Sequence, residues 1–205
     1  KPMLKFNNKH FIQYVLNCNS KYNFKRIIIL CGFRNKIFFE KLNKKLKNLT
    51  KIICIKENKL LGTGGALSNL KKLNVKDFVL VNGDTVFNIN LNSLIKNLDK
   101  NKIGIVALTK NKDQQSKKLF NLSVKNKSLY FTENSSIMNG GVYFFKKNIF
   151  KYINNKSCSL EDEILPKLIN SKKIQGKFFK DFFIDIGSKY FFKVANSKLK
   201  KEFCK

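Results

Sequence analysis

The chain has 205 residues, 43% of them hydrophobic, which is enough for one α/β domain with a core of its own. No apolar run approaches the roughly 20 residues of a membrane-spanning helix, so we expect no membrane partner. The formal net charge of +29 would suit nucleic acid, but only Arg26 and Arg34 among the 42 cationic residues are arginines. Arginine is the preferred residue for contacts with phosphates and bases, so we expect no nucleic-acid partner and ascribe the lysines to an AT-rich genome.

The cysteines are scattered and do not form the pattern of a metal centre. None stands in a Cys-x-x-Cys pair, and His10 is the only histidine that could join them, so no zinc site is expected. An odd number of separated cysteines is typical of a reduced, cytoplasmic protein. The five are Cys18, Cys31, Cys54, Cys158 and Cys204.

The first half of the chain alternates between helical and strand-like patterns. Apolar residues recurring every three or four positions predict a helix, and short apolar, β-branched runs predict a strand. The order indicates an α/β fold with a Rossmann-like, mixed but mainly parallel sheet flanked by helices, in which the strand before the first helix is absent. We predict helices over 10–20, 35–46, 66–73 and 91–98, and strands over 26–31, 51–56, 78–82 and 103–109.

The second half adds strands in a different order. Two apolar runs over 119–124 and 128–132 predict a hairpin, and a helix over 159–169 begins with a Ser cap followed by acids. No internal repeat or long linker interrupts the chain, so we predict a single domain over 1–205. The remaining predicted elements are strands over 142–145, 174–179 and 182–186 and a closing helix over 189–203.

A glycine-rich turn lies between the second predicted strand and the next helix. Residues 61–67 read Leu-Gly-Thr-Gly-Gly-Ala-Leu. Glycines allow a close backbone approach, and a turn that opens a helix can direct its N–H groups toward a base or a phosphate. The alternative is a tight turn that binds nothing, because the motif is neither a Walker A loop nor G-x-G-x-x-G.

Two acids each follow or end an apolar strand. Asp84 comes after Phe-Val-Leu-Val-Asn-Gly, and Asp185 stands between Ile184 and Ile186. Ligands of open α/β sheets bind at the carboxyl ends of strands, and Mg²⁺ prefers one or two carboxylates together with phosphate oxygens. The pair therefore predicts a shared Mg²⁺ site. The alternatives are a turn-capping role for Asp84 and an outward-pointing Asp185.

A second glycine-rich corner could hold a sugar. Asn139 and Gly140 open a run that leads into the strand over 142–145, and a ring could lie against backbone without side chains. Glu133, at the end of the preceding strand, could accept hydrogen bonds from sugar hydroxyls. A plain hairpin turn and a lone surface acid are the alternatives. The single His10 supports no catalytic triad.

The order of these motifs resembles the sugar-1-phosphate nucleotidyltransferases, the enzymes that make NDP-sugars. The likeness covers essentially the whole chain, and residues 159–161 and 183–187 look most like the guanylyltransferases that act on manno-heptose or mannose 1-phosphate. The matching stretches are Lys1-Pro2-Met3 with Lys9, Phe11 and Tyr14, Leu61–Leu67, Val81–Thr85, Phe131–Asn134, Asn139–Phe144 and Asp181–Gly187.

The resemblance implies a fold, a reaction and a set of site residues. The fold would be that of the nucleotide-diphospho-sugar transferases, with a nucleotide-binding half over 1–109 and a sugar-binding half over 110–205. GTP and a sugar 1-phosphate would give NDP-sugar and pyrophosphate, for lipopolysaccharide or capsule synthesis, and a homo-oligomer is a further candidate assembly. The catalytic residues would be Lys1, Asp84 and Asp185, with Mg²⁺ on the two acids; the nucleotide-binding residues Leu61, Gly62, Thr63, Gly64, Gly65, Asn82 and Gly83; and the sugar-binding residues Glu133, Asn139 and Gly140.

Two departures from the family pattern leave other functions open. The family's GGxGTRL phosphate loop is absent from the chain and would precede Lys1, so we expect this stretch alone to be inactive. Asn134 stands where many members have a lysine that binds the sugar phosphate. The alternative functions are a sugar-nucleotide-binding module without catalysis and, third, a basic nucleic-acid-binding protein.

Overall fold

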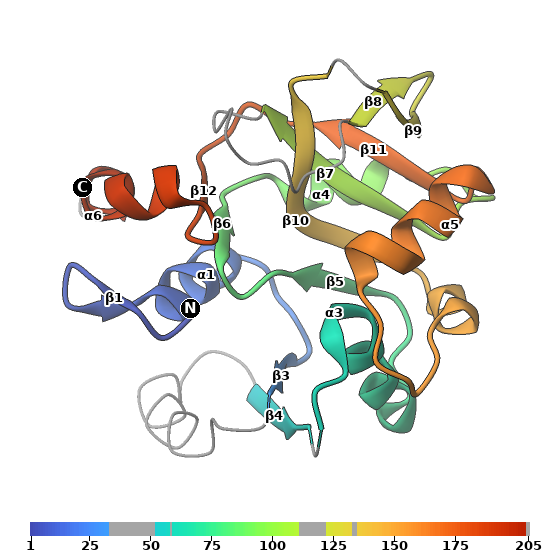
Figure 1. Ribbon diagram of the computed structural model, residues 1–205, viewed down its shortest axis with the longest axis horizontal. Coiled ribbons are helices and arrows are strands. Elements are labelled where there is room, and N and C mark those ends of the chain that lie inside the picture. The colour runs from blue at the N-terminus through green and yellow to red at the C-terminus, as the bar shows by residue number, and fades with distance from the viewer. Residues whose placement is uncertain (33–51, 58, 111–121, 133–134, 204–205) are drawn as a thin grey trace. The chain divides into compact units, whose positions relative to one another are not determined.

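The computed structural model describes residues 1–32, 52–57, 59–110, 122–132 and 135–203 (Figure 1). The chain divides into two compact units, which we call unit 1 and unit 2. Among the described residues, no helix has both the length and the apolar character needed to cross a bilayer. Unit 1 comprises Lys1–Lys21, Asp77–Lys146 and Ile169–Lys205, and unit 2 comprises Tyr22–Lys76 and Lys147–Leu168.

Unit 1 is built on a six-stranded mixed sheet in the order β5, β10, β7, β11, β9, β8. β10 runs antiparallel to both β5 and β7, whereas β11 runs parallel to β7. The hairpin of β8 and β9 pairs with β11 through β9. The strands are β5 (Phe78–Val81), β7 (Gly104–Lys110), β8 (Leu122–Lys125), β9 (Ser128–Phe131), β10 (Ile137–Phe145) and β11 (Ile174–Phe178).

The prediction of a mixed α/β sheet is confirmed, but the described strands are less parallel than predicted. In this sheet, β11 and β7 form the parallel pair, because β10 inserts between β5 and β7 in the opposite direction. The sequence pattern underestimated β10, which begins at Ile137 rather than at 142. Because β10 is long, this strand from the second half of the chain pairs with two strands from the first half, β5 and β7.

The helices of unit 1 bury the apolar residues that the periodicity singled out. α1 (Phe11–Asn19) buries Phe11 and Tyr14 completely, and α6 (Lys189–Phe203) buries one face along its length. The short α4 (Leu91–Lys96) begins at Asn90, whose side chain accepts a hydrogen bond from the backbone N–H of Ser93. These spans confirm the predicted helices over 10–20, 91–98 and 189–203.

The sequence did not predict a small hairpin at the start of unit 1. β1 (Lys5–Phe6) and β2 (Lys9–His10) are joined by Asn7 and Asn8, which both have positive φ, as in a type I′ turn. Asn7 also binds Asn196 of α6 through its backbone N–H and its side chain. Strands of two residues are too short for periodicity to reveal, although consecutive asparagines are a turn signal.

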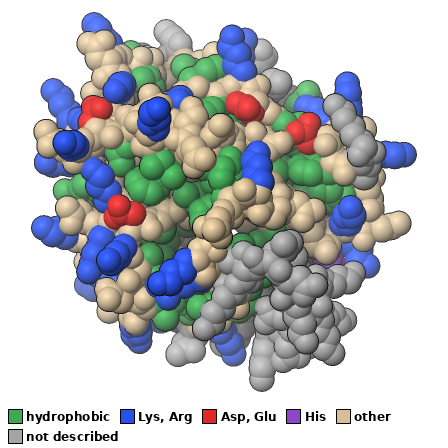
Figure 2. Space-filling view, turned by 180° about the vertical axis from the view of Figure 1, so that it is seen from behind, with side chains coloured by type: hydrophobic (Ala, Val, Ile, Leu, Met, Phe, Trp, Pro, Cys, Tyr) green, Lys and Arg blue, Asp and Glu red, His purple; other side chains and the backbone are tan. Residues whose placement is uncertain are grey.

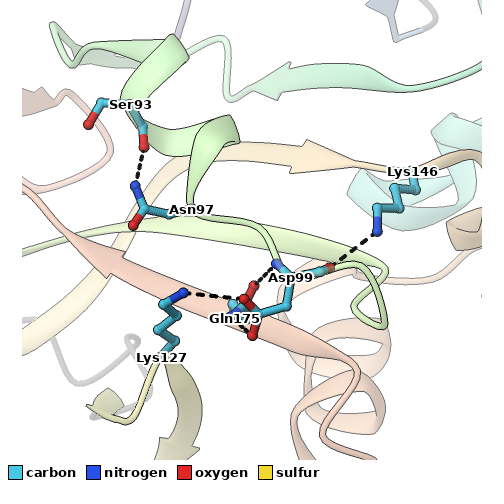
Figure 3. Close-up of polar contacts among 6 residues, drawn as sticks. All are labelled: Ser93, Asn97, Asp99, Lys127, Lys146 and Gln175. Atoms are coloured by element: carbon cyan, nitrogen blue, oxygen red, sulfur yellow. Dashed lines mark hydrogen bonds and ion pairs between the residues drawn. The ribbon is translucent and has the colours of Figure 1, made fainter.

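The buried Gln175 ties β11 to Asp99 in the loop that precedes β7 (Figure 3). Gln175 on β11 is fully buried; its Nε2 donates to the Asp99 carboxylate and its Oε1 accepts from the Asp99 backbone N–H, both at 2.8 Å. Lys127 reaches the same carboxylate at 3.3 Å, and Lys146 donates to the Asp99 carbonyl. The cluster is structural, because its members satisfy one another.

We expect Gln175→Leu to lower the free energy of unfolding by about 2–3 kcal/mol, because it removes two hydrogen bonds and leaves the Asp99 N–H without its acceptor. Lys127→Ala, which removes an exposed ion pair to the same Asp99 carboxylate, is expected to cost less than about 1 kcal/mol. Urea unfolding of both variants measures the difference. Equal losses would contradict the structural role of Gln175.

Unit 2 contains the parallel pair β3 (Ile27–Cys31) and β4 (Ile52–Lys56). A short helix, α3 (Gly62–Gly65), runs directly into the 3-10 helix η1 (Ala66–Leu73). The 3-10 helix η2 (Lys147–Tyr152) and the π-helix η3 (Leu160–Ile164), which continues as α5 (Leu165–Asn170), follow later in the chain. The predicted strands and the Ser159 cap are confirmed, and the predicted helix over 35–46 lies outside the described residues.

Basic residues are spread over the face of the molecule that is seen in Figure 2. On the face shown in Figure 2, Lys and Arg side chains are interspersed with neutral and apolar atoms, and few acids accompany them. With a net charge of +29, such a surface attracts small anions in general.

Candidate active site

In unit 1 the structure brings together the two acids that the sequence singled out. A two-stranded antiparallel sheet pairs β6 (Thr85–Phe87), which directly follows Asp84, with β12 (Phe183–Asp185), whose last residue is Asp185. Asp185 lies opposite Thr85, and the backbone N–H of Ile186 donates to the Asp84 carbonyl at 3.0 Å. Two acids from distant parts of the chain therefore occupy neighbouring positions at one end of this pair of strands.

Lys1 lies beside this pair. Its Nζ is 3.9 Å from Asp84 Oδ2, with the two side chains 58% and 31% exposed, so the ion pair itself adds little stability. The backbone holds Lys1 in place: its carbonyl accepts from the N–H of Leu4, and the Pro2 carbonyl accepts from the N–H of Ile12 in α1. The ring of Pro2 also lies against Gly83.

The Asp185 carboxylate is held by the loop that follows it. The backbone N–H of Gly187 donates to Asp185 Oδ1 at 2.7 Å. Burial raises the pKa of Asp185 to about 6; the hydrogen bond from Gly187 opposes this, the nearby Asp84 carboxylate adds to it, and Lys1 opposes it. A partly buried carboxylate next to another one is a place where a cation relieves both desolvation and repulsion.

This donor set fits the divalent cation that the sequence predicted. Two carboxylates leave most of an octahedral shell to waters and phosphate oxygens, which is the way in which Mg²⁺ is usually bound. Within the described ranges no group of three or more His, Cys, Asp or Glu side chains gathers.

The raised pKa of Asp185 predicts a pH-dependent stability in EDTA. The proton binds more tightly in the folded chain than in the unfolded chain, so its contribution is present below about pH 4 and is lost as the pH rises through about 6. Asp185→Asn is neutral throughout. Its stability relative to the parent chain should therefore increase between about pH 4 and 6 and then level off, as followed by thermal unfolding. A difference independent of pH would contradict the assignment.

Asn82 and Gly83 lie just before Asp84 at the end of β5. The Asn82 N–H donates to the carbonyl of Gly141 at 2.9 Å, and its own carbonyl accepts from Thr85. The predicted nucleotide-binding residues of unit 1 therefore belong to the same strand end as the acids. Their contact with a nucleotide stays a prediction.

The second glycine-rich corner is an irregularity inside β10. The pairing of β10 with β7 shifts between Asn139 and Val142, and Gly141 has a φ of +68° there. Asn139 accepts from the Gly141 N–H and donates to the Tyr143 hydroxyl. A Cβ on Gly140 would lie 2.4 Å from the ring of Phe87, so packing alone requires glycine at this position. The sugar contacts of Asn139 and Gly140 stay predictions, and Glu133 lies outside the described residues.

The glycine-rich turn of unit 2 is covered by another segment of the same unit. The backbone N–H groups of Gly64 and Gly65 both donate to the carbonyl of Cys158, at 3.0 and 3.2 Å, and the N–H of Cys158 donates to the Leu61 carbonyl. A Cβ on Gly62, whose φ is +70°, would lie 2.5 Å from the same carbonyl. Two N–H groups that we predicted to face a ligand thus already have a protein acceptor.

Thr63 connects this turn to the start of η3. Its hydroxyl donates to the Glu161 carboxylate at 2.6 Å and accepts from the Leu160 N–H at 2.9 Å. The family resemblance assigned Thr63 to the nucleotide and gave Glu161 no role at this turn. The likeness of Ser159-Leu160-Glu161 to the guanylyltransferases was the available signal. Whether Leu61–Gly65 contact a base stays a prediction.

Comparison with known proteins assigns the chain to a family. The family model described as nucleotidyl transferase matches residues 1–202. The chain therefore belongs to the nucleotidyl transferase family and is a nucleotidyltransferase, which confirms the resemblance read from its motifs.

Individual proteins with similar sequences or folds add detail to the family assignment. The chain is similar to D-glycero-alpha-D-manno-heptose 1-phosphate guanylyltransferase of Campylobacter jejuni, with 28% identity over 191 residues that cover 91% of this chain and 85% of that protein. It is 27% identical to the bifunctional protein GlmU of Methanococcus maripaludis and spans 46% of that longer protein. Its fold matches the crystal structure of HddC from Yersinia pseudotuberculosis with a TM-score of 0.80 and 24% identity, covering 97% of this chain and 89% of that chain. The predicted nucleotide-diphospho-sugar transferase fold is thus confirmed.

Proposed function

We propose that this chain transfers GMP from GTP to a heptose or mannose 1-phosphate, giving a GDP-sugar and pyrophosphate. The observation that carries the proposal is the meeting of Asp84 and Asp185 at one strand end with Lys1 beside them. The choice of guanine and of sugar is supported by the relative in Campylobacter jejuni, whose name describes a guanylyltransferase for manno-heptose 1-phosphate.

In this reaction a phosphate oxygen of the sugar 1-phosphate attacks the α-phosphorus of the nucleotide. The new P–O bond forms as the bond to the β-phosphate breaks, and pyrophosphate leaves with that electron pair. Mg²⁺ bound by Asp84 and Asp185 would neutralise the phosphates and orient them. The Lys1 ammonium, 3.9 Å from Asp84, would contact the phosphates and stabilise the charge that develops on them.

Substrate contacts outside the pair of acids form part of the same proposal. Within unit 2, the turn Leu61–Gly65 would read the base. Within unit 1, Asn82 and Gly83 are proposed nucleotide-binding residues. Asn139, Gly140 and Glu133 would bind the sugar. We retain the division into a nucleotide-binding half over 1–109 and a sugar-binding half over 110–205 as a proposal.

We also propose where in the cell the reaction takes place and which kind of reaction uses its product. A GDP-sugar of this type would be made in the cytoplasm and consumed by glycosyl transfer into a cell-surface polysaccharide, as lipopolysaccharide or capsule. The scattered, unpaired cysteines of the described residues are consistent with a reducing compartment. Formation of a homo-oligomer belongs to the proposal as well.

A thermal-shift screen tests the choice of nucleotide and sugar. A ligand that binds only the folded chain raises its apparent melting temperature, by an amount that grows with concentration over Kd. With Mg²⁺ present, GTP and GDP-mannose should stabilise the chain more than UTP, CTP, dTTP or their sugar derivatives at equal concentration. A larger shift with a pyrimidine nucleotide would refute the guanine assignment, and no shift with any nucleotide would refute nucleotide binding.

A further inference from the structure

We propose that Gly187 is a positioning residue whose missing side chain keeps open the space between Asp84, Asp185 and Lys1 in which a divalent cation binds. The proposal rests on the cation site proposed above and adds a residue to which that proposal gives no role. It follows from what a side chain at position 187 would touch.

Among the described residues, the three atoms nearest to a Cβ built on Gly187 all belong to charged side chains. The Cβ would lie 2.9 Å from Asp185 Oδ1, 3.4 Å from Lys1 Nζ and 3.6 Å from Asp84 Oδ2. The Cβ direction of Gly187 therefore points to the place where both carboxylates and the ammonium converge. A methyl group there would occupy the space that the cation and its ligands need.

Neither backbone conformation nor core packing explains a glycine at this position. Gly187 does not have a left-handed φ, unlike Gly62 and Gly141, so alanine can adopt its conformation. It is exposed, whereas a Cβ on Gly140 or Gly104 would run into aromatic rings of the core. The first atoms that a side chain at 187 would crowd belong to the candidate site.

Gly187 also acts through its backbone. Its N–H donates to Asp185 Oδ1, the same oxygen that a Cβ would approach at 2.9 Å. One residue thus fixes the orientation of the carboxylate and leaves the adjacent space free. Groups that orient a metal ligand in this way matter for affinity, and their loss typically weakens metal binding by about 10–100-fold.

The test measures Mn²⁺ binding, without substrate, by the electron paramagnetic resonance signal of the free ion. We expect Gly187→Ala to weaken Mn²⁺ binding by about tenfold or more while its melting temperature in EDTA stays close to that of the parent chain. Gly32→Ala is the matched control, because among the described residues a Cβ there meets one Leu60 side-chain atom, at an ordinary 3.7 Å. It should bind Mn²⁺ like the parent.

A double-mutant cycle with Lys1→Ala separates crowding from a general structural effect. If the methyl group crowds the space shared with the Lys1 ammonium, its cost should be smaller in the Lys1→Ala background than in the parent chain. Unchanged Mn²⁺ affinity in Gly187→Ala would overturn the inference, and so would loss of the folded state in EDTA. Failure of the cation site itself would look different, because Asp84→Asn and Asp185→Asn would then bind Mn²⁺ as the parent does.

Discussion

In the chain with a GGxGTRL segment joined ahead of Lys1, Asp185→Asn is expected to lower kcat/KM for nucleotidyl transfer by about 100-fold or more, and Asp84→Asn by a similar factor. Each change keeps the shape of the side chain and removes a charge that would hold the cation against the transferring phosphate. The stability of Asp185→Asn should not fall at neutral pH, because burial already disfavours the charged form of Asp185. Loss of activity without loss of stability is the signature of a residue that acts on the reaction.

Asp181→Asn is the matched control for this experiment. Asp181 is an exposed carboxylate in the segment that leads into β12, and it takes no part in the contacts between Asp84, Asp185 and Lys1. Its substitution should change kcat/KM by less than about twofold and stability by less than about 0.5 kcal/mol. A loss of less than about tenfold in both Asp84→Asn and Asp185→Asn would rule out the two-carboxylate mechanism.

Gly62→Ala is expected to destabilise unit 2 by about 2–4 kcal/mol, the second-largest effect that we predict. An alanine would have to adopt a φ of +70° and place its Cβ 2.5 Å from the carbonyl oxygen of Cys158. That oxygen accepts from the N–H groups of Gly64 and Gly65, so moving it would break both hydrogen bonds. Relieving the clash would therefore break these hydrogen bonds, in addition to the strain that the positive φ imposes on alanine.

Leu60→Ala provides the comparison for Gly62→Ala. Leu60 stands two residues before Gly62 and is 75% exposed, so its truncation should cost less than about 0.5 kcal/mol. Urea denaturation with a probe in unit 2, such as thiol labelling of Cys158, reports the two variants side by side. A stable Gly62→Ala chain would show that the segment around Cys158 does not cover the turn.

The sequence was most informative where charged residues end apolar strands. Asp84 and Asp185 each follow or end an apolar strand, which predicted a shared site, and the structure places them in neighbouring positions. The helices over 10–20 and 189–203 were equally predictable, because each has one apolar face that must be buried. Such local rules act on residues close in the chain.

Contacts between distant segments could not be predicted in the same way. The periodicity of the sequence does not predict that β10 inserts between β5 and β7. Nor does it predict that the carbonyl of Cys158 accepts hydrogen bonds from the N–H groups of Gly64 and Gly65. The glycines illustrate the limit. Gly62, Gly140 and Gly187 look alike in the sequence, but the structure gives each a different reason to be glycine. Gly62 has a positive φ and lies close to the Cys158 carbonyl, and Gly140 lies against the ring of Phe87. A side chain at Gly187 would enter the candidate cation site.

The most direct test is phosphorus NMR of the chain with a GGxGTRL segment joined ahead of Lys1, which serves as the parent chain, together with GTP, mannose or manno-heptose 1-phosphate, and Mg²⁺. We predict that GDP-sugar and pyrophosphate appear in equal amounts, that EDTA stops the reaction, and that Asp84→Asn and Asp185→Asn show neither product on the same timescale. Product formation by these two variants at the rate of the parent chain, or no product from the parent chain with any nucleoside triphosphate, would contradict the proposed function.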